Sequence, residues 1–242
     1  MVKYMGIDGC RGGWFYLGRT REDEWIFGLL PSIEDLKNMA SPRTRICLDM
    51  PMGLLDRSPE ERRCDKLARK CLGKKGASIF PAPCRAALDA PDYATASQVN
   101  FEHTGRRLSC QSFNIIPKIR EVDRFITTTD VTLKECHPEL SFQALNQGNA
   151  MAHSKKSPEG REERLVVLSR WIPEIRTLFD QACRGFLRKE LALDDILDAA
   201  VLAVVAGLGE QVIALPDAAE YDGKGIPMQI IYPDAQAVGR MG

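Results

Sequence analysis

Three features that would place a chain in a specialised class are missing from this sequence of 242 residues. Its eight cysteines include no C-x-x-C pair, so neither a disulfide framework nor a zinc ribbon is indicated. The longest apolar stretch, around Ala199 to Leu208, is far too short to span a bilayer. The 33 basic and 33 acidic side chains cancel, so affinity for nucleic acid would need a local basic face. We expect a cytoplasmic protein with reduced thiols and no membrane association.

The first fifty residues predict three antiparallel strands, a short helix and a fourth strand. Alternating or apolar segments separated by turns form the three strands, at 2–8, 14–17 and 25–30. Ser32 and Asp35 have the spacing of a capping box, which starts a helix that runs to about Met39. The compact apolar segment from Thr44 to Leu48 then forms a strand that stops before a proline.

This order of elements predicts where two aspartates lie. A right-handed crossover from the meander can place the fourth strand parallel to the first and beside it. Asp8, at the end of the first strand, and Asp49, at the end of the fourth, would then be about 5 Å apart. Ligands of open α/β sheets bind at the carboxyl ends of such strands.

The rest of the chain completes an α/β prediction. We expect one domain over 1–242, with a helical insertion at 51–114 after the fourth strand. A fifth strand follows at 131–136, then a helix capped by Ser157 that runs to Ser169, a last helix from Asp194 or Asp195 to Gly207, and a closing hairpin near 221–232. The predicted fold is a mixed five-stranded sheet, an antiparallel meander plus parallel strands, flanked by helices.

The last predicted helix carries two acids on one face, because Asp195 and Asp198 are three residues apart. Helix capping and compensation of the helix dipole are the ordinary explanation for Asp194 and Asp195. Asp198 lies a full turn inside a helix that is otherwise Ala, Val, Leu and Ile, where an unpaired carboxylate is costly. A metal ion or a cationic partner would remove that cost.

Four carboxylates therefore become candidates for one site: Asp8, Asp49, Asp195 and Asp198. Hard oxygen ligands of this kind suit Mg²⁺ or Mn²⁺. Two such ions about 4 Å apart activate water and stabilise the leaving oxygen in phosphodiester hydrolysis. Taken singly, Asp8 is equally explained as a turn residue before glycine, and Asp49 as a strand terminator before proline.

Several segments in order resemble the predicted RNase H-like nuclease family, also called domain of unknown function 429. They span nearly the whole chain: GIDGCRGGW, DMPMGL, CLGKKGASIFPAPCR, FNIIPKIREVD, ECHPELSF, SKKSPEGREERLVVL and DDILDAAVLAV. The D-x-G of the first strand and the terminal D-x-x-D-A-x-x-x-A are also similar to Holliday-junction resolvases of the RNase H superfamily. The resemblance implies an RNase H-like fold and cleavage of DNA or RNA. Resolvases usually have glutamate as the second acid, whereas Asp49 is shorter.

The family-like motifs add five candidates. Glu135 and Glu139, the two glutamates of the sequence Glu-Cys-His-Pro-Glu at the end of the fifth strand, are near enough to face the same site. Glu139 would be an extra catalytic ligand, or else an ordinary acid in the first turn of a helix. Four basic residues could hold a phosphate or balance the acids, or else be solvated surface charges: Lys118, Lys155, Lys156 and Arg164. In the insertion, Arg62, Lys66, Arg69 and Lys70 lie near one helical face, but interleaved acids favour a plain surface.

Two other functions compete with a metal-dependent nuclease. The glycine-rich turn after Asp8 is also similar to the phosphate loop of sugar kinases and actin-like ATPases, which are phosphotransferases. Those proteins need two related lobes and a second phosphate loop, and neither is evident here. A catalytically silent scaffold that binds nucleic acid or protein is the third possibility, and the zero net charge is compatible with it.

Overall fold

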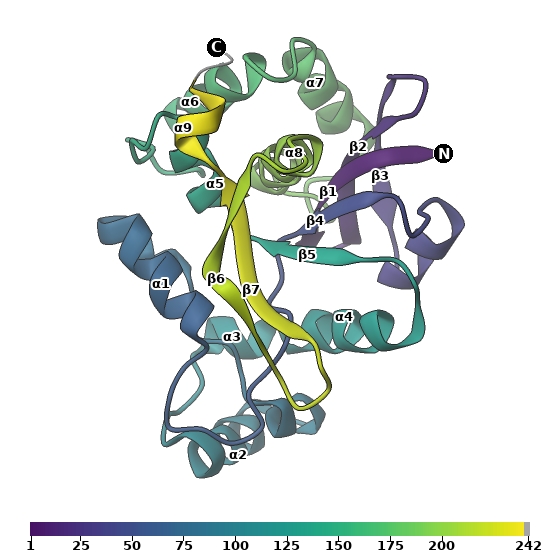
Figure 1. Ribbon diagram of the computed structural model, residues 1–242. Helices are drawn as coiled ribbons and strands as arrows, with labels where there is room; N and C mark the ends of the chain where they lie inside the picture. Colours follow the sequence, from purple (N-terminus) through teal and green to yellow (C-terminus); the bar gives the residue numbers. More distant parts are fainter. Residues whose placement is uncertain (240–242) are drawn as a thin grey trace. The chain divides into compact units, whose positions relative to one another are not determined.

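The computed structural model describes residues 1–239, in two compact units (Figure 1). The first unit contains Met1–Asp49, Thr128–Ile213 and the chain from Ile231 onward. The second contains Met50–Thr127 and Ala214–Ile230. All residues of the predicted insertion, 51–114, belong to the second unit, which continues to Thr127.

A seven-stranded mixed sheet has the order β3-β2-β1-β4-β5-β7-β6. The pairs β1–β2 and β2–β3 are antiparallel, and β1–β4 and β4–β5 are parallel. The strands are β1 (Val2–Cys10), β2 (Gly13–Thr20), β3 (Trp25–Leu30), β4 (Arg45–Leu48), β5 (Leu133–Cys136), β6 (Val212–Tyr221) and β7 (Pro227–Pro233).

The mixed α/β architecture is as predicted, but the number of strands is not. The closing hairpin, expected as a separate element, pairs through β7 with β5 and extends the sheet to seven strands. An edge strand exposes unpaired backbone groups, and the hairpin satisfies those of β5. Sequence periodicity identifies such a hairpin without showing which strand it joins.

The N-terminal predictions for the meander and the crossover are confirmed. Ser32 accepts a hydrogen bond from a helix N–H, and Asp35 caps in return, at the start of the short 3₁₀-helix η1 (Ile33–Asn38). Strand β4 then lies parallel to β1, with Ile7 opposite Leu48. One boundary differs, because β1 continues two residues beyond Asp8 through its pairing with β2.

Helix α8 is the central helix of the first unit and packs against β1, β2 and β4. Its residues are apolar on nearly all sides and buried from Ile196 to Ala206. Gly6 makes the contact with β1 possible, because a Cβ there would overlap the backbone of Ala199 and Ala203. Helices α5 and α6 also contact α8. The helices of this unit are α5 (Pro138–Leu145), α6 (Pro158–Ser169), α7 (Ile175–Gly185), α8 (Leu193–Gly207) and α9 (Ala235–Val238).

The second unit is mainly helical. Lys66 and Lys70 of its basic helix are exposed, as expected for a surface, and Lys66 pairs with Glu60. Arg62, which precedes the helix, differs: it is 3% exposed and donates to both carboxylate oxygens of Asp65. The helices are α1 (Arg63–Leu72), η2 (Gly73–Ser78), η3 (Arg85–Asp89), α2 (Tyr93–Thr104), α3 (Cys110–Asn114) and α4 (Ile116–Thr128).

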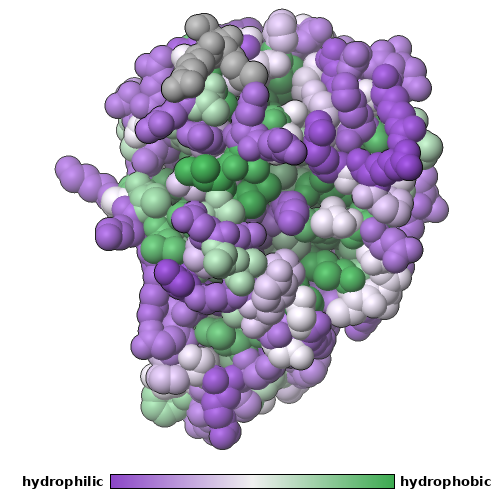
Figure 2. Space-filling view, in the orientation of Figure 1, coloured by the Kyte–Doolittle hydropathy of each residue, from purple (hydrophilic) through white to green (hydrophobic). Residues whose placement is uncertain are grey.

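Hydrophilic residues cover most of the molecular face in Figure 2. None of the helices formed by residues 1–239 combines the length and the apolar character needed to cross a bilayer.

Candidate acidic active site

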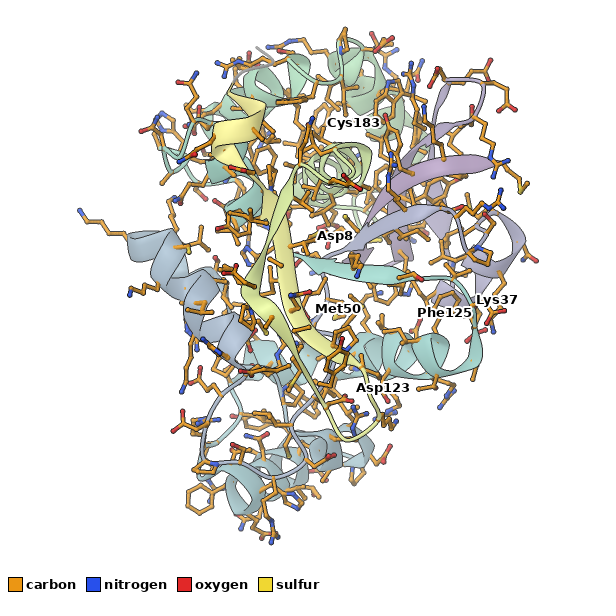
Figure 3. The ribbon with its side chains drawn as sticks, viewed as in Figure 1. Asp8, Lys37, Met50, Asp123, Phe125 and Cys183 are labelled. Carbon is orange, nitrogen blue, oxygen red and sulfur yellow. The ribbon has the colours of Figure 1, made fainter. Side chains whose placement is uncertain are left out.

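Asp8 and Asp49 are brought together by the parallel pairing of β1 and β4. The ladder ends at Ile7 and Leu48, and the backbone N–H of Asp49 donates to the carbonyl of Ile7 at 3.1 Å. Asp8, labelled in Figure 3, is the next residue of β1 and is 7% exposed. The predicted adjacency of these two acids at one end of the sheet is thus present in the fold.

Helix α8 adds acids in two different roles. Asp195 accepts a hydrogen bond from the backbone N–H of Ala192 at 2.9 Å, so it caps the helix. Asp198, one turn further, is 1% exposed. Its Oδ1 atom is buried and accepts no hydrogen bond from any residue between 1 and 239. A buried oxygen without a donor is costly, so this atom is in place for a ligand.

Lys155 supplies a positive charge to this group of acids from the segment before α6. Its Nζ donates to Asp198 Oδ2 at 2.6 Å and lies 3.7 Å from Asp194 Oδ2. Asp194 and Asp198 are four residues apart, so they face Lys155 from successive turns of α8. Lys155, one of the four basic residues predicted to bind substrate, is thus bonded to one of the predicted metal-binding acids.

Burial and mutual repulsion raise the pKa values of these carboxyl groups. Burial raises the pKa of Asp8 well above its ordinary value, and repulsion from Asp49 and Asp198 raises it further. Burial and then repulsion from Asp198 raise the pKa of Asp49 to about 7. Asp195 has a pKa of about 6, because burial outweighs its hydrogen bond from Ala192. The group therefore holds more negative charge than its surroundings neutralise.

Lys155 compensates part of that charge. Burial alone would lower the pKa of Lys155, but attraction to Asp198 and then to Asp8 outweighs burial and raises it. Burial raises the pKa of Asp198, and the ion pair with Lys155 limits the rise. At neutral pH Lys155 is therefore a permanent cation, and it lies close to several acids.

Two further acids belong to this neighbourhood: Glu135, expected near the site but given no role, and Asp194, interpreted from the sequence as a helix cap. Glu135, on β5 opposite Leu48, is 5% exposed and raises the pKa of Asp49 by repulsion. Asp194 approaches Lys155, as described above. Glu135 shares its strand face with the buried Leu133, and an acid at such a position was the available sequence signal.

Glu139 and Arg164 form a separate ion pair. The Arg164 guanidinium donates to Glu139 and, at 3.0 Å, to the carbonyl of Gly160, and it lies over the ring of Phe142. Arg164 is only 1% exposed. These contacts favour a structural role for both residues, although Glu139 is close enough to raise the pKa of Asp198.

Lys156 and Lys118 complete the set of predicted basic residues. Lys156 is exposed next to Lys155, and its backbone N–H contacts Ser154 Oγ at 3.4 Å. Lys118 is half-buried on α4 in the second unit.

The donor chemistry fits a hard divalent cation, although the ligands are not closed around one point. Within residues 1–239, no three His, Cys, Asp or Glu side chains are arranged to hold a metal ion. Lys155 already takes one oxygen of Asp198, while the other has no donor. Oxygen ligands with surplus negative charge are those that Mg²⁺ and Mn²⁺ prefer. A metal would need Lys155 to move away or to share Asp198.

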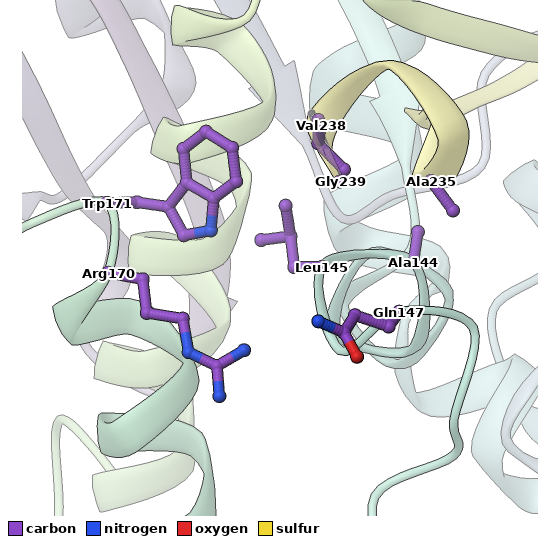
Figure 4. Close-up of a pocket in the computed structure, with 8 residues that line it drawn as sticks. All are labelled: Ala144, Leu145, Gln147, Arg170, Trp171, Ala235, Val238 and Gly239. Carbon is purple, nitrogen blue, oxygen red and sulfur yellow. The ribbon is translucent and has the colours of Figure 1, made fainter. Parts of the chain in front are cut away.

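A pocket elsewhere in the first unit contains none of the predicted site residues. It has a volume of 260 Å³ and lies between α5, the connection of α6 to α7, and α9 (Figure 4). Trp171 and Leu145 contribute apolar walls, and Arg170 and Gln147 contribute polar groups.

The first unit is thus a mixed α/β fold that carries a buried acidic group at one end of its parallel strands. The chain belongs to the family described as protein of unknown function (DUF429), whose sequence profile matches residues 6–220. Comparison with curated proteins gives no match, and comparison with solved structures gives none either.

Proposed function

We propose that this chain is a divalent-metal-dependent nuclease with an RNase H-like fold, and that Asp8, Asp49, Asp195 and Asp198 bind its metal. The buried Oδ1 of Asp198, which lacks a donor within residues 1–239 and lies among acids with raised pKa values, is the observation that carries the proposal. Perturbed carboxyl groups of this kind concentrate at functional sites.

The strand arrangement supports the fold assignment. Three antiparallel strands are followed by two that run parallel to the first, in the order β3-β2-β1-β4-β5. The parallel neighbours β1 and β4 are those predicted from the sequence, and the acids lie where these two strands part. The edge hairpin β6–β7 is an addition to that pattern.

Each residue would have a distinct task. Asp8 and Asp198, both buried, would hold the ion, and Asp49 would complete its shell from the neighbouring strand. Bound Mg²⁺ or Mn²⁺ supplies a water of lowered pKa and neutralises charge on the leaving oxygen. Asp195, which also caps the start of α8, would contribute the fourth carboxylate. Lys155, once released from Asp198, would attract a phosphate oxygen.

The test combines metal binding with cleavage. Mn²⁺ binding is measured by calorimetry for the native protein, Asp8→Asn, Asp198→Asn and the control Asp180→Asn, an exposed acid on α7. We expect the two site variants to bind Mn²⁺ at least about tenfold more weakly, because each loses a charged ligand. Cleavage of single-stranded DNA, duplex DNA, RNA and a four-way junction should fall about 100-fold or more in the same variants. Cleavage that both variants retain would exclude the proposal.

A catalytically silent binding scaffold is the second candidate, and the position of Lys155 favours it. An ammonium 2.6 Å from Asp198 is a built-in counter-ion that could replace a metal permanently. In that case the native protein binds no Mn²⁺ and cleaves none of the four substrates. Saturable Mn²⁺ binding that depends on Asp198 would argue against this alternative.

A further inference from the structure

A second pocket of the first unit lies at the opposite end of the parallel strands from the acids. It has a volume of 430 Å³ and is formed where β4 begins, beside β5 and the C-terminal turn of α8. Strand β4 has four residues, so its two ends are about 10–13 Å apart. The pocket and the acidic group therefore share the same strand and helix without sharing a residue.

The inner wall of this pocket is apolar. Ile46 and Ala206 line it and are 1% and 3% exposed. Val212 and Ile231, half-buried on β6 and β7, complete the wall. An apolar wall of this size stabilises a compact hydrocarbon or aromatic group by removing it from water.

The rim of the pocket is basic. Arg43, Arg45 and Lys134 line it, and none of the lining residues that the structure describes is acidic. Neither Arg43 nor Lys134 pairs with an acid within residues 1–239. Three cations around an apolar wall match a molecule that has both an apolar body and a negative group.

Arg45 is fixed in place by the protein itself. Its Nε donates to the carbonyl of Ala206 at 2.7 Å and its Nη2 to that of Gly207 at 3.3 Å, and the guanidinium lies over the Tyr4 ring. These bonds satisfy the C-terminal carbonyls of α8. Arg45 thus forms a rigid side of the rim, and Arg43 and Lys134 remain to contact a ligand.

The other two cations are carried by well-anchored backbone. Arg43 belongs to a turn closed by the bond from Thr44 N–H to the carbonyl of Ser41, at 2.9 Å. The buried Thr44 hydroxyl donates to the carbonyl of Val2 and fastens the turn to β1. Lys134 lies on β5 opposite Cys47. Backbone that is already ordered reduces the entropy lost on binding.

We propose that this pocket binds a small organic oxyanion, a phosphate or carboxylate group on a compact apolar body. The apolar group lies against Ile46, Val212 and Ile231, and the oxyanion lies between Arg43 and Lys134. Its volume is within the range of small-molecule sites, roughly 300–1,000 Å³. This site is independent of the proposed nuclease site and does not require a metal.

The test uses four probes in buffer with EDTA, so that no metal occupies the acidic group. Phenyl phosphate and benzoate each carry a ring and an anion, inorganic phosphate carries the anion alone, and benzyl alcohol the ring alone. Binding is measured by calorimetry and by methyl NMR. We expect saturable binding of phenyl phosphate or benzoate, with shifts at Ile46, Val212 and Ile231, and at least about tenfold weaker binding of the two half-probes. Which anion binds more tightly identifies the oxyanion.

Variants locate the site. Arg43→Ala and Lys134→Ala should each weaken binding about tenfold, the effect of one charge-assisted hydrogen bond. Thr132→Trp, at an exposed position on the rim, should block the pocket without disturbing the core. Lys189→Ala, an exposed cation of the same unit, and Asp198→Asn should leave binding unchanged.

Three outcomes would overturn the proposal. The first is the absence of saturable binding by either ring-bearing anion. The second is binding that survives the Arg43, Lys134 and Thr132 variants, which would place it elsewhere. The third is a half-probe that binds as tightly as the complete probes, because the apolar wall or the cations would then contribute nothing.

Discussion

Two groups of buried and half-buried acids in this protein differ in how their charges are balanced. In the second unit, Arg85 pairs with Asp222 and, at 2.5 Å, with Asp123, which also accepts from Lys224 at 2.7 Å. In the first unit, Lys155 donates to Asp198 at 2.6 Å, and burial together with repulsion from Asp198 raises the pKa values of Asp8 and Asp49.

The pKa values express this contrast. Burial tends to raise the pKa of Asp123, but hydrogen bonds from Lys224 and Arg85 outweigh it and lower the pKa. At Asp49, burial and repulsion from Asp198 outweigh attraction to Lys155 and raise the pKa to about 7. Buried acids that are paired with cations can be accounted for by their structural role alone. Buried acids without enough cations destabilise the fold unless a ligand binds them, and such acids concentrate at functional sites. The lowered pKa of Asp123 is typical of an ion-pair network, whereas the raised pKa of Asp49 is typical of a candidate site.

The largest effect is expected where the balanced network is broken. Arg85→Met removes the charged partner of Asp222, whose side chain is 0% exposed and keeps backbone hydrogen bonds from Leu54, Lys224 and Ile226. Removing one partner of a buried pair costs about 3–5 kcal/mol, so the Tm should fall by about 10 °C. The matched control is Arg63→Met, whose side chain is 62% exposed and pairs with Glu220, and it should change stability by less than about 1 kcal/mol. Equal Tm values for the two variants would show that the network does not stabilise the fold.

Neutralising Asp49 should raise the Tm, whereas breaking the Arg85 network lowers it. The folded protein holds the Asp49 proton up to about pH 7, whereas the unfolded chain releases it near pH 4. Stability therefore falls as pH rises from about 4 to 7, and the cost is complete above that range. In EDTA, Asp49→Asn should raise the Tm by about 3–8 °C at pH 8 and leave it nearly unchanged at pH 4.

Asp123→Asn is the internal control for that experiment. The lowered pKa of Asp123 means that its ionised form stabilises the fold above its unfolded pKa, and that this stabilisation is lost as pH falls through its folded pKa. The variant should lower the Tm at pH 8. Thermal unfolding of both variants at pH 4 and pH 8 checks the two signs, and a common sign would remove the contrast between the two acidic groups.

The smallest of these effects concerns Lys155. If Lys155 and a metal compete for Asp198, Lys155→Met should tighten Mn²⁺ binding about tenfold at pH 7.5, as measured by calorimetry. Lys156→Met, at the exposed next residue, should not change it. Weaker or unchanged binding in Lys155→Met would show that Lys155 does not compete with the ion.

The sequence predicted elements whose signals are local. Ser32 with Asp35, and Ser157 before Pro158, mark helix starts that the structure contains. The alternation of apolar residues predicted β1 to β4, and the handedness of the crossover placed Asp49 beside Asp8. Local patterns of this kind are sufficient because capping and strand alternation depend on neighbouring residues.

Other features could not be read from neighbouring residues. The attachment of the β6–β7 hairpin to β5 joins segments far apart in the chain. The roles of Glu139 and Arg164 depended on their meeting across α5 and α6, and the contribution of Glu135 depended on which strand β5 joins.

The sequence by itself determined which acids lie at strand and helix starts or ends, because those positions follow from turns, caps and periodicity. Only the tertiary structure decided their charge balance. Gly6 allows α8 to approach β1, Lys155 reaches Asp198 from another segment, and the pocket with its basic rim forms where β4, β5 and α8 meet. The physical reason is that burial and Coulomb interactions depend on distance in space, which the order of residues does not specify.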